Sequence, residues 1–357
     1  MSLHRVTDLG ELHRHLGAAL QLEHATIPPY LVALYSIRPG TNSDAHHVLR
    51  AVVVEEMLHL TLAANILNAI GGDPDLTAEG FVPTYPAYLP DGETDFEVSL
   101  QAFSKEAVDT FLKIERPAAA AGQGVKTVHR RRTNGSVRAA RTRDDSEEHF
   151  YSIGEFYQAI EQGLVELHAQ QGDAMFSGDP ARQITPEYYY SGGSDVIPVT
   201  DLTSAQAAIR VISEQGEGMG GHIFDVEDEI AHYYRFEQLV LGRYYLAGDQ
   251  TGDPTGGLLD VDWEAVYPVK TNARLSDYPE GSELRAGAVA FNAGYADFLG
   301  LLTRAFRGEP GLLTGAVGAM FQIKELACQL MRQPIDRSTG LHAVPTFEIP
   351  AATVEGS

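Results

Sequence analysis

The 357-residue chain has 49 acidic but only 26 basic side chains, which gives it a formal net charge of -23 at pH 7. A surface this acidic repels nucleic acids and anionic membranes, so neither is expected as a partner. The single cysteine, Cys328, excludes an intrachain disulfide framework, a cysteine-rich zinc site and an iron–sulfur cluster.

The composition and the first residues predict one elaborated, cytoplasmic domain over residues 1–357. A hydrophobic fraction of 44% is enough for a large core. Residues 1–34 contain no long apolar run, because charged residues and histidines interrupt them throughout. No signal peptide or membrane span is therefore expected.

The first predicted helix covers about residues 8–37, where apolar residues recur at helical spacing. Glu23 lies inside this apolar stripe instead of opposite it, and a carboxylate in that place needs a partner. Pro28 and Pro29 follow closely. Because proline removes a backbone hydrogen bond of a helix, they leave carbonyl groups near Glu23 without their usual partners and predict a bend there.

The second predicted helix covers about residues 44–71 and ends at a Gly-Gly-Asp-Pro sequence. It carries the first of two Glu-x-x-His sequences, Glu56 and His59. Residues three apart lie on one face of a helix, so a Glu and a His at this spacing can bind the same ion. Glu55 points away from the apolar stripe and is interpreted as solvated or as a support for a neighbouring group.

A short helix is predicted over residues 103–114, followed by a basic segment over residues 118–143 in an otherwise acidic protein. Two interpretations of the basic segment stay open. It is either a mobile surface loop or hairpin, or a lid that supplies arginine to the carboxylate of a substrate.

The third bundle helix is predicted over about residues 151–171. On an ideal helical wheel, Glu155 lies away from its apolar face, Glu161 lies nearer to that face, and Glu166 is no better placed than Glu155. Periodicity therefore does not choose the carboxylate that this helix contributes to a site. A further helix is predicted over residues 203–215, and Glu217, which follows it closely, is another candidate.

The fourth bundle helix is predicted over about residues 225–246 and carries the second Glu-x-x-His sequence, Glu229 and His232. Acidic residues at its start suit the positive end of a helix dipole. Two further apolar helices over about residues 285–333 are expected to pack on the bundle.

Two Glu-x-x-His sequences, with single carboxylates on two other helices, are what a carboxylate-bridged dinuclear metal site in a helix bundle requires. Oxygen and nitrogen donors suit iron or manganese better than calcium, and the absence of thiolate argues against a structural zinc ion. The alternative is a buried polar network without metal. One Glu-x-x-His pair alone would favour that alternative, whereas two pairs together with Glu23 favour a metal site.

Several stretches of the sequence carry a family resemblance. They are residues 22–30 (LEHATIPPY), 55–59 (EEMLH), 153–157 (IGEFY), 197–201 (IPVTD), 214–218 (EQGEG), 232–236 (HYYRF) and 345–348 (PTFE). In these stretches the chain resembles the ferritin-like domain of the iminophenyl-pyruvate dimer synthase family. That family is related to the enzymes that form chromopyrrolic acid in bisindole biosynthesis, and its better-known members couple two imines of aryl pyruvates oxidatively.

The resemblance implies an all-α, ferritin-like four-helix bundle with long crossover excursions and extra C-terminal helices. It also implies a set of metal-binding, catalytic residues: Glu23, Glu56, His59, Glu155, Glu229 and His232. Glu155 is favoured over Glu161 because it lies in one of the matching stretches. Family members in bisindole pathways are commonly much longer, and this chain corresponds only to their ferritin-like part.

The sequence therefore predicts a dinuclear non-haem oxidoreductase of specialised metabolism, with two iron ions per chain or, alternatively, manganese. Its expected partners are dioxygen and a small organic, amino-acid-derived substrate. Without rubredoxin-like cysteines, further electrons must come from the substrate or from a separate reductase, which favours an oxidase over an oxygenase. The alternatives are a ferritin-type protein for iron binding and detoxification, a manganese catalase-like protein, and a metal-free structural protein.

Overall fold

The computed structural model describes residues 6–90, 96–117, 152–189, 196–218, 222–225, 228–336 and 338–349. Within these ranges the chain is all-α, as predicted, and strand-like pairing is limited to isolated bridges such as that between Phe224 and Ile230. The basic segment 118–143 lies outside the described residues, so both of its interpretations stay predictions.

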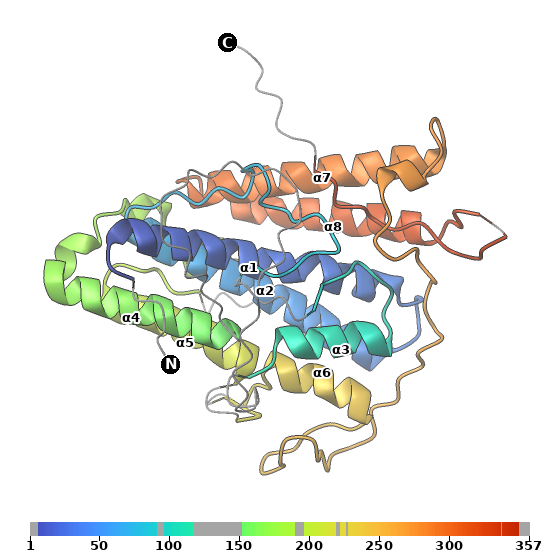
Figure 1. Cartoon of the computed structure of the whole chain (residues 1–357), viewed down its shortest axis with the longest axis horizontal. Coiled ribbons are helices and arrows are strands. Elements are labelled where there is room, and N and C mark those ends of the chain that lie inside the picture. Colours follow the sequence, from blue (N-terminus) through green and yellow to red (C-terminus); the bar gives the residue numbers. More distant parts are fainter. Residues whose placement is uncertain are drawn as a thin grey trace.

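Two long helices, α1 (Leu9–Ser36) and α2 (Ser43–Ala69), pack against each other at the centre of the molecule (Figure 1). The carboxylate of Asp8 caps α1 by accepting a hydrogen bond of 2.8 Å from the N–H of Glu11. By length and composition α2 could cross a membrane, but 78% of its apolar window is buried inside the protein. Such burial is typical of a core helix.

Helix α1 continues through both of its prolines. Pro29 cannot donate a hydrogen bond to the carbonyl of Ala25, four residues earlier. The hydroxyl of Tyr85 donates to that carbonyl instead, at 2.8 Å. The predicted loss of a normal backbone partner near Glu23 is thus confirmed at Ala25, and a side chain from outside the helix compensates for it.

The other two positions of the bundle are each filled by a pair of short helices. One pair is α3 (Lys105–Ile114) and α4 (Ile153–Gln171), and the other is α5 (Leu202–Glu217) and α6 (His232–Leu241). Helix α4 packs on α5, and α3 packs on α6. Figure 1 shows α4 and α5 towards one end of α1 and α2, and α3 and α6 towards the other. At both of these positions, helix ends therefore lie in the middle of the bundle.

Helices α7 (Glu283–Phe306) and α8 (Leu312–Met331) pack as a pair on the opposite side of the central helices (Figure 1). The amide of Asn68 in α2 ties them to the bundle by donating a hydrogen bond of 2.8 Å to the carbonyl of Phe306. Short 3-10 turns complete the described helical structure: η1 (Gly172–Met175), η2 (Pro180–Arg182), η3 (Pro186–Tyr188) and η6 (Leu275–Asp277).

The fourth bundle helix begins later than predicted, at His232 instead of near residue 225. Ahead of it the chain turns back on itself, and the N–H groups of Asp225 and Ala231 donate to the carbonyls of Glu229 and Ile223 at 2.9 and 3.2 Å. Asp228 has a positive φ of 62°, which a right-handed helix does not permit. Glu229 therefore lies outside α6, and the predicted Glu229–His232 helical pair is not formed.

Candidate metal centre

Four of the predicted site residues meet in the core. Glu23 of α1, Glu56 and His59 of α2 and His232 of α6 are each at most 3% exposed. Glu56, His59 and His232 offer ligand atoms that all lie within 4.8 Å of one another, close enough to hold a metal ion. The first Glu-x-x-His sequence thus brings both of its side chains into the core, where the histidine of the second joins them, and metal binding by these residues stays a prediction.

His232 has one ring nitrogen in a hydrogen bond and the other turned to the cluster. Its Nε2 lies 2.9 Å from Oε2 of Glu55, and a carboxylate oxygen can only accept, so Nε2 carries the proton. Its Nδ1 lies 3.0 Å from Oε1 of Glu56 and 3.6 Å from Oε2 of Glu115. Neither contact has hydrogen-bond geometry, so this buried nitrogen has no hydrogen-bond partner among the described residues.

His59 repeats this arrangement. Its Nε2 lies 3.0 Å from the amide oxygen of Gln215 near the end of α5, and its Nδ1 lies 3.5 Å from Oε2 of Glu23. The rings of His59 and His232 are stacked, with centroids 5.3 Å apart. Both imidazoles thus turn Nδ1 towards the buried carboxylates while an outer partner holds Nε2.

The three buried carboxylates also share one pattern: one oxygen of each accepts a hydrogen bond from a hydroxyl group, and the other faces an imidazole Nδ1. The hydroxyl contacts are Tyr157 to Glu23 Oε1 at 2.6 Å, Thr26 to Glu56 Oε2 at 2.9 Å and Tyr30 to Glu115 Oε1 at 2.5 Å. Burial and the neighbouring carboxylates raise the pKa of Tyr157 and of Tyr30 well above the usual value, so both phenols stay protonated and donate. These contacts fix the inward direction of the remaining oxygens.

The electrostatics of the cluster call for a cation. Burial, followed by the charge of Glu115, raises the pKa of Glu56 to about 7. Burial alone would lower the pKa values of His59 and His232, but the surrounding carboxylates raise both. In the metal-free protein protons would meet this requirement, and a divalent ion held by oxygen and imidazole ligands would meet it as well. The donor set therefore fits iron or manganese.

Glu115, which the sequence analysis did not select, supplies the third carboxylate. It forms the C-terminal cap of α3 and is 2% exposed. A helix C-terminus disfavours negative charge, so its position has no local explanation. A signal was present in the sequence, because Glu115 continues the apolar stripe of Val108 and Phe111 at helical spacing, as Glu23 does in α1.

Helix α4 contributes a phenol, Tyr157, to the cluster. Glu155 lies half-buried in the first turn of α4, where its N–H donates to Oγ of the cap residue Ser152 at 3.1 Å. Glu161 accepts a hydrogen bond of 2.9 Å from Gln206 of α5. The side chain of Glu217 lies outside the described part of the chain. Metal binding by Glu155 stays a prediction that the residue's half-buried position does not favour.

Glu229 does not face the cluster. Its side chain is 61% exposed and pairs with Arg235 at 2.9 Å, because the turn before α6 carries it to the surface. Glu55 instead supports the second histidine, in keeping with its interpretation as a supporting group. Burial would raise the pKa of Glu55, but His232 and Arg235 lower it below its usual value, so this carboxylate is ionised.

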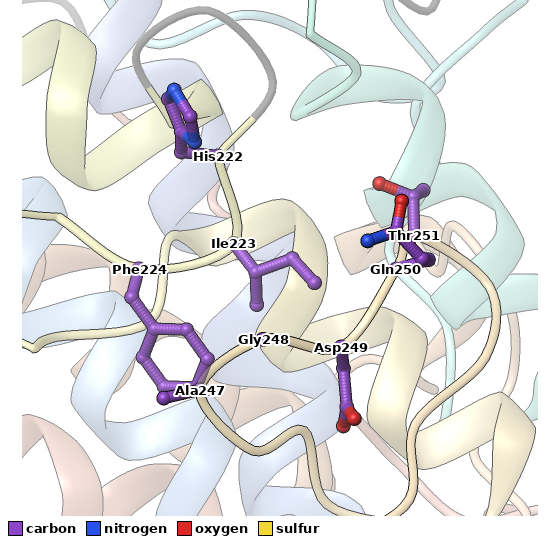
Figure 2. Close-up of a pocket in the computed structure, with 8 residues that line it drawn as sticks. All are labelled: His222, Ile223, Phe224, Ala247, Gly248, Asp249, Gln250 and Thr251. Atoms are coloured by element: carbon purple, nitrogen blue, oxygen red, sulfur yellow. The ribbon is translucent and has the colours of Figure 1, made fainter.

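A pocket of about 470 Å³ opens beside the start of α6 (Figure 2). Its lining comes from two segments, residues 222–224 and 247–251. Figure 2 shows the apolar side chain of Phe224 on one side and the polar side chain of Thr251 on the other. The carbonyl of Ile223 in the first segment accepts a hydrogen bond of 3.2 Å from the N–H of Ala231, which directly precedes His232. One wall of the pocket is thus bonded to the residue next to a candidate ligand.

Three comparisons with known proteins bear on the family and the fold of this chain. Residues 16–241 match a family model described as ferritin-like. The chain is 28% identical over 344 residues to the dichlorochromopyrrolate synthase of Lentzea aerocolonigenes, an alignment that covers 87% of this chain but 30% of that enzyme. A crystal structure of a ferritin-like protein from Caulobacter vibrioides has a TM-score of 0.62 and 23% identity, and the match covers 96% of this chain and 99% of the other. The last match supports the fold alone.

Proposed function

Because the chain belongs to the ferritin-like family and holds a buried cluster of carboxylates and imidazoles in its core, we propose that it is a dinuclear non-haem iron oxidoreductase. In this proposal it uses dioxygen to oxidise a small, amino-acid-derived molecule in specialised metabolism. The similarity to a named biosynthetic synthase supports an enzymatic role. The chain spans only 30% of that enzyme's length, so the reaction of the whole enzyme is not assigned to it. The reaction proposed here rests on the site of this chain.

The observation that carries the proposal is that Nδ1 of both His59 and His232 faces the oxygen of a buried carboxylate. At His232 this contact does not have the geometry of a hydrogen bond. One ion would be held by His232 and Glu115, the other by His59 and Glu23, and Glu56 lies where it could serve both. When bound, a pair of ferrous ions supplies two electrons to dioxygen at once. Manganese is the alternative metal for the same ligands.

The protein's own part is to orient these ligands and to exclude water from them. The hydroxyls of Tyr30, Thr26 and Tyr157 hold one oxygen of each carboxylate and leave the other for an ion. Side chains of this kind around a metal site fix ligand direction and tune the bound ion. Because the carboxylates are buried, ions of opposite charge stabilise them strongly.

An oxidase reaction needs no separate electron-donor protein, because the substrate supplies the electrons that reduce dioxygen. The substrate loses two electrons and two protons, and dioxygen gains both to form hydrogen peroxide. Cys328 is the only cysteine of the chain, so a rubredoxin-like iron site within it is excluded. An oxygenase would need a separate reductase. We therefore favour the oxidase, and we place its substrate in the pocket lined by residues 222–224 and 247–251.

Anaerobic loading with ferrous iron, followed by elemental analysis, tests the proposal. We expect close to two ions per chain in the native protein and a loss of at least one in Glu115→Ala. Glu229→Ala serves as a matched control that keeps both ions, because its exposed carboxylate pairs with Arg235. Binding of one ion or none by the native protein would refute the dinuclear site.

The loaded protein is then mixed with dioxygen and the imine of an aryl pyruvate, while oxygen consumption and peroxide are measured. One peroxide formed per substrate oxidised supports the oxidase. Oxygen incorporated into the product, with a requirement for added reductant, would indicate an oxygenase instead. Sedimentation as a large closed shell, with iron uptake and no substrate oxidation, would indicate iron storage.

A further inference from the structure

The two histidines of the metal centre rest on partners of different charge. Nε2 of His232 lies 2.9 Å from a carboxylate oxygen of Glu55, whereas Nε2 of His59 lies 3.0 Å from the amide oxygen of Gln215. The two contacts have the same form and nearly the same length. They differ in that one acceptor is an anion and the other is neutral.

Glu55 is held in place as an anion. Its side chain is 18% exposed, and its Oε1 lies 3.1 Å from the guanidinium of Arg235. Arg235 is fixed in turn, because its Nε donates a hydrogen bond of 2.5 Å to the carbonyl of Ile230. A carboxylate that accepts from one imidazole nitrogen raises the basicity of the other nitrogen and strengthens its bond to a metal ion. Gln215 orients His59 but contributes no charge.

The inner carboxylates are divided more evenly between the two histidines. Nδ1 of His232 has two carboxylate oxygens within reach, from Glu56 at 3.0 Å and from Glu115 at 3.6 Å. Nδ1 of His59 lies 3.5 Å from Glu23, and the charge of Glu56 also acts on His59. Because Glu56 could serve both ions, the additional negative charge at the His232 position comes from Glu55.

We propose that the two metal positions bind divalent ions with unequal affinity and fill in order, the His232 position first, and that Glu55 and Gln215 are positioning residues that set this order. This inference rests on the proposed dinuclear function. Outer partners of metal-binding histidines typically change metal affinity by about 10-fold to 100-fold. The two dissociation constants are therefore expected to differ by at least about tenfold.

Titration of the metal-free protein with Mn²⁺ under anaerobic conditions measures both steps. The electron paramagnetic resonance signal of free Mn²⁺ reports how many ions are bound, and calorimetry gives the two affinities. We expect a first ion to bind tightly as an isolated ion and a second to bind more weakly. Magnetic coupling between the ions should appear only with the second.

Two substitutions exchange the outer partners. Glu55→Gln should weaken the first step by about 10-fold to 100-fold and bring the two affinities together. Gln215→Glu should strengthen binding of the second ion. It should therefore also reduce the difference between the two dissociation constants. Glu229→Gln is the matched control, because Glu229 shares the Arg235 partner with Glu55 but its side chain is 61% exposed. Both steps should be unchanged in it.

Two ions bound with equal affinity in the native protein would overturn the inference and leave the dinuclear function standing. An effect of Glu55→Gln no larger than that of Glu229→Gln would overturn it as well. If circular dichroism shows that Glu55→Gln does not fold, Gln215→Glu decides, and an unchanged second step then refutes the proposed order. Saturation at one ion or none would instead refute the dinuclear function itself.

Discussion

The metal-free protein should lose stability as the pH rises from about 5 to about 8, owing to its buried carboxylates and histidines. Burial raises the pKa of Glu56 from 4.5 to about 7. Between these values the folded protein holds a proton that the unfolded chain has released, so stability falls with rising pH. The difference, at about 1.4 kcal/mol per pH unit, is on the order of 3 kcal/mol.

The histidines act in the same direction. The carboxylates raise the pKa values of His59 and His232, against the effect of burial. A raised histidine pKa contributes stability that is fully present below the unfolded value of 6.5 and is lost as the pH rises through the folded value. Glu55 has the opposite sign because its pKa is lowered, but its contribution is lost only below pH 4.5, outside this window.

The assay is urea unfolding of chelator-treated and metal-loaded protein, followed by circular dichroism at several pH values in this range. Metal ions replace the protons of the cluster, so the loaded protein should show a much flatter pH dependence and a higher midpoint. The difference between the two curves removes the effect of surface charge. The stability of the metal-free protein, measured relative to that of the loaded protein, should fall towards pH 8. If it stays constant or increases, the assignment of the cluster is refuted.

Two further predictions concern α4. Tyr157→Phe removes the hydroxyl that holds Glu23, so we expect a loss of about 1.5–3 kcal/mol in urea unfolding and weaker metal retention; an unchanged midpoint would contradict this. Glu155→Ala and Glu161→Ala should both keep two ions in elemental analysis, because one residue lies half-buried at the helix start and the other pairs with Gln206. Loss of metal in Glu155→Ala alone would restore the ligand set implied by the family resemblance.

The parts of the site that lie within one helix could be read from the sequence. Glu23 stands in the apolar stripe of α1, and Glu56 and His59 stand three residues apart in α2. In a regular helix the spacing of residues fixes the face on which they lie. The extra helices α7 and α8 and the position of three site residues followed from this rule, whereas the all-α, ferritin-like arrangement was implied by the family resemblance.

Two positions of the bundle are each filled by a pair of helices, and the tertiary structure decided which side chains these helices contribute to the site. The left-handed turn at Asp228 ends the helical spacing before His232, so Glu229 moves to the surface while the histidine stays in the core. Glu115 reaches the cluster because α3 packs on α6, a contact between segments far apart in the chain. Periodicity determines the faces within a helix, but helix ends and the packing of separate helices depend on turns and long-range contacts that a local pattern does not contain.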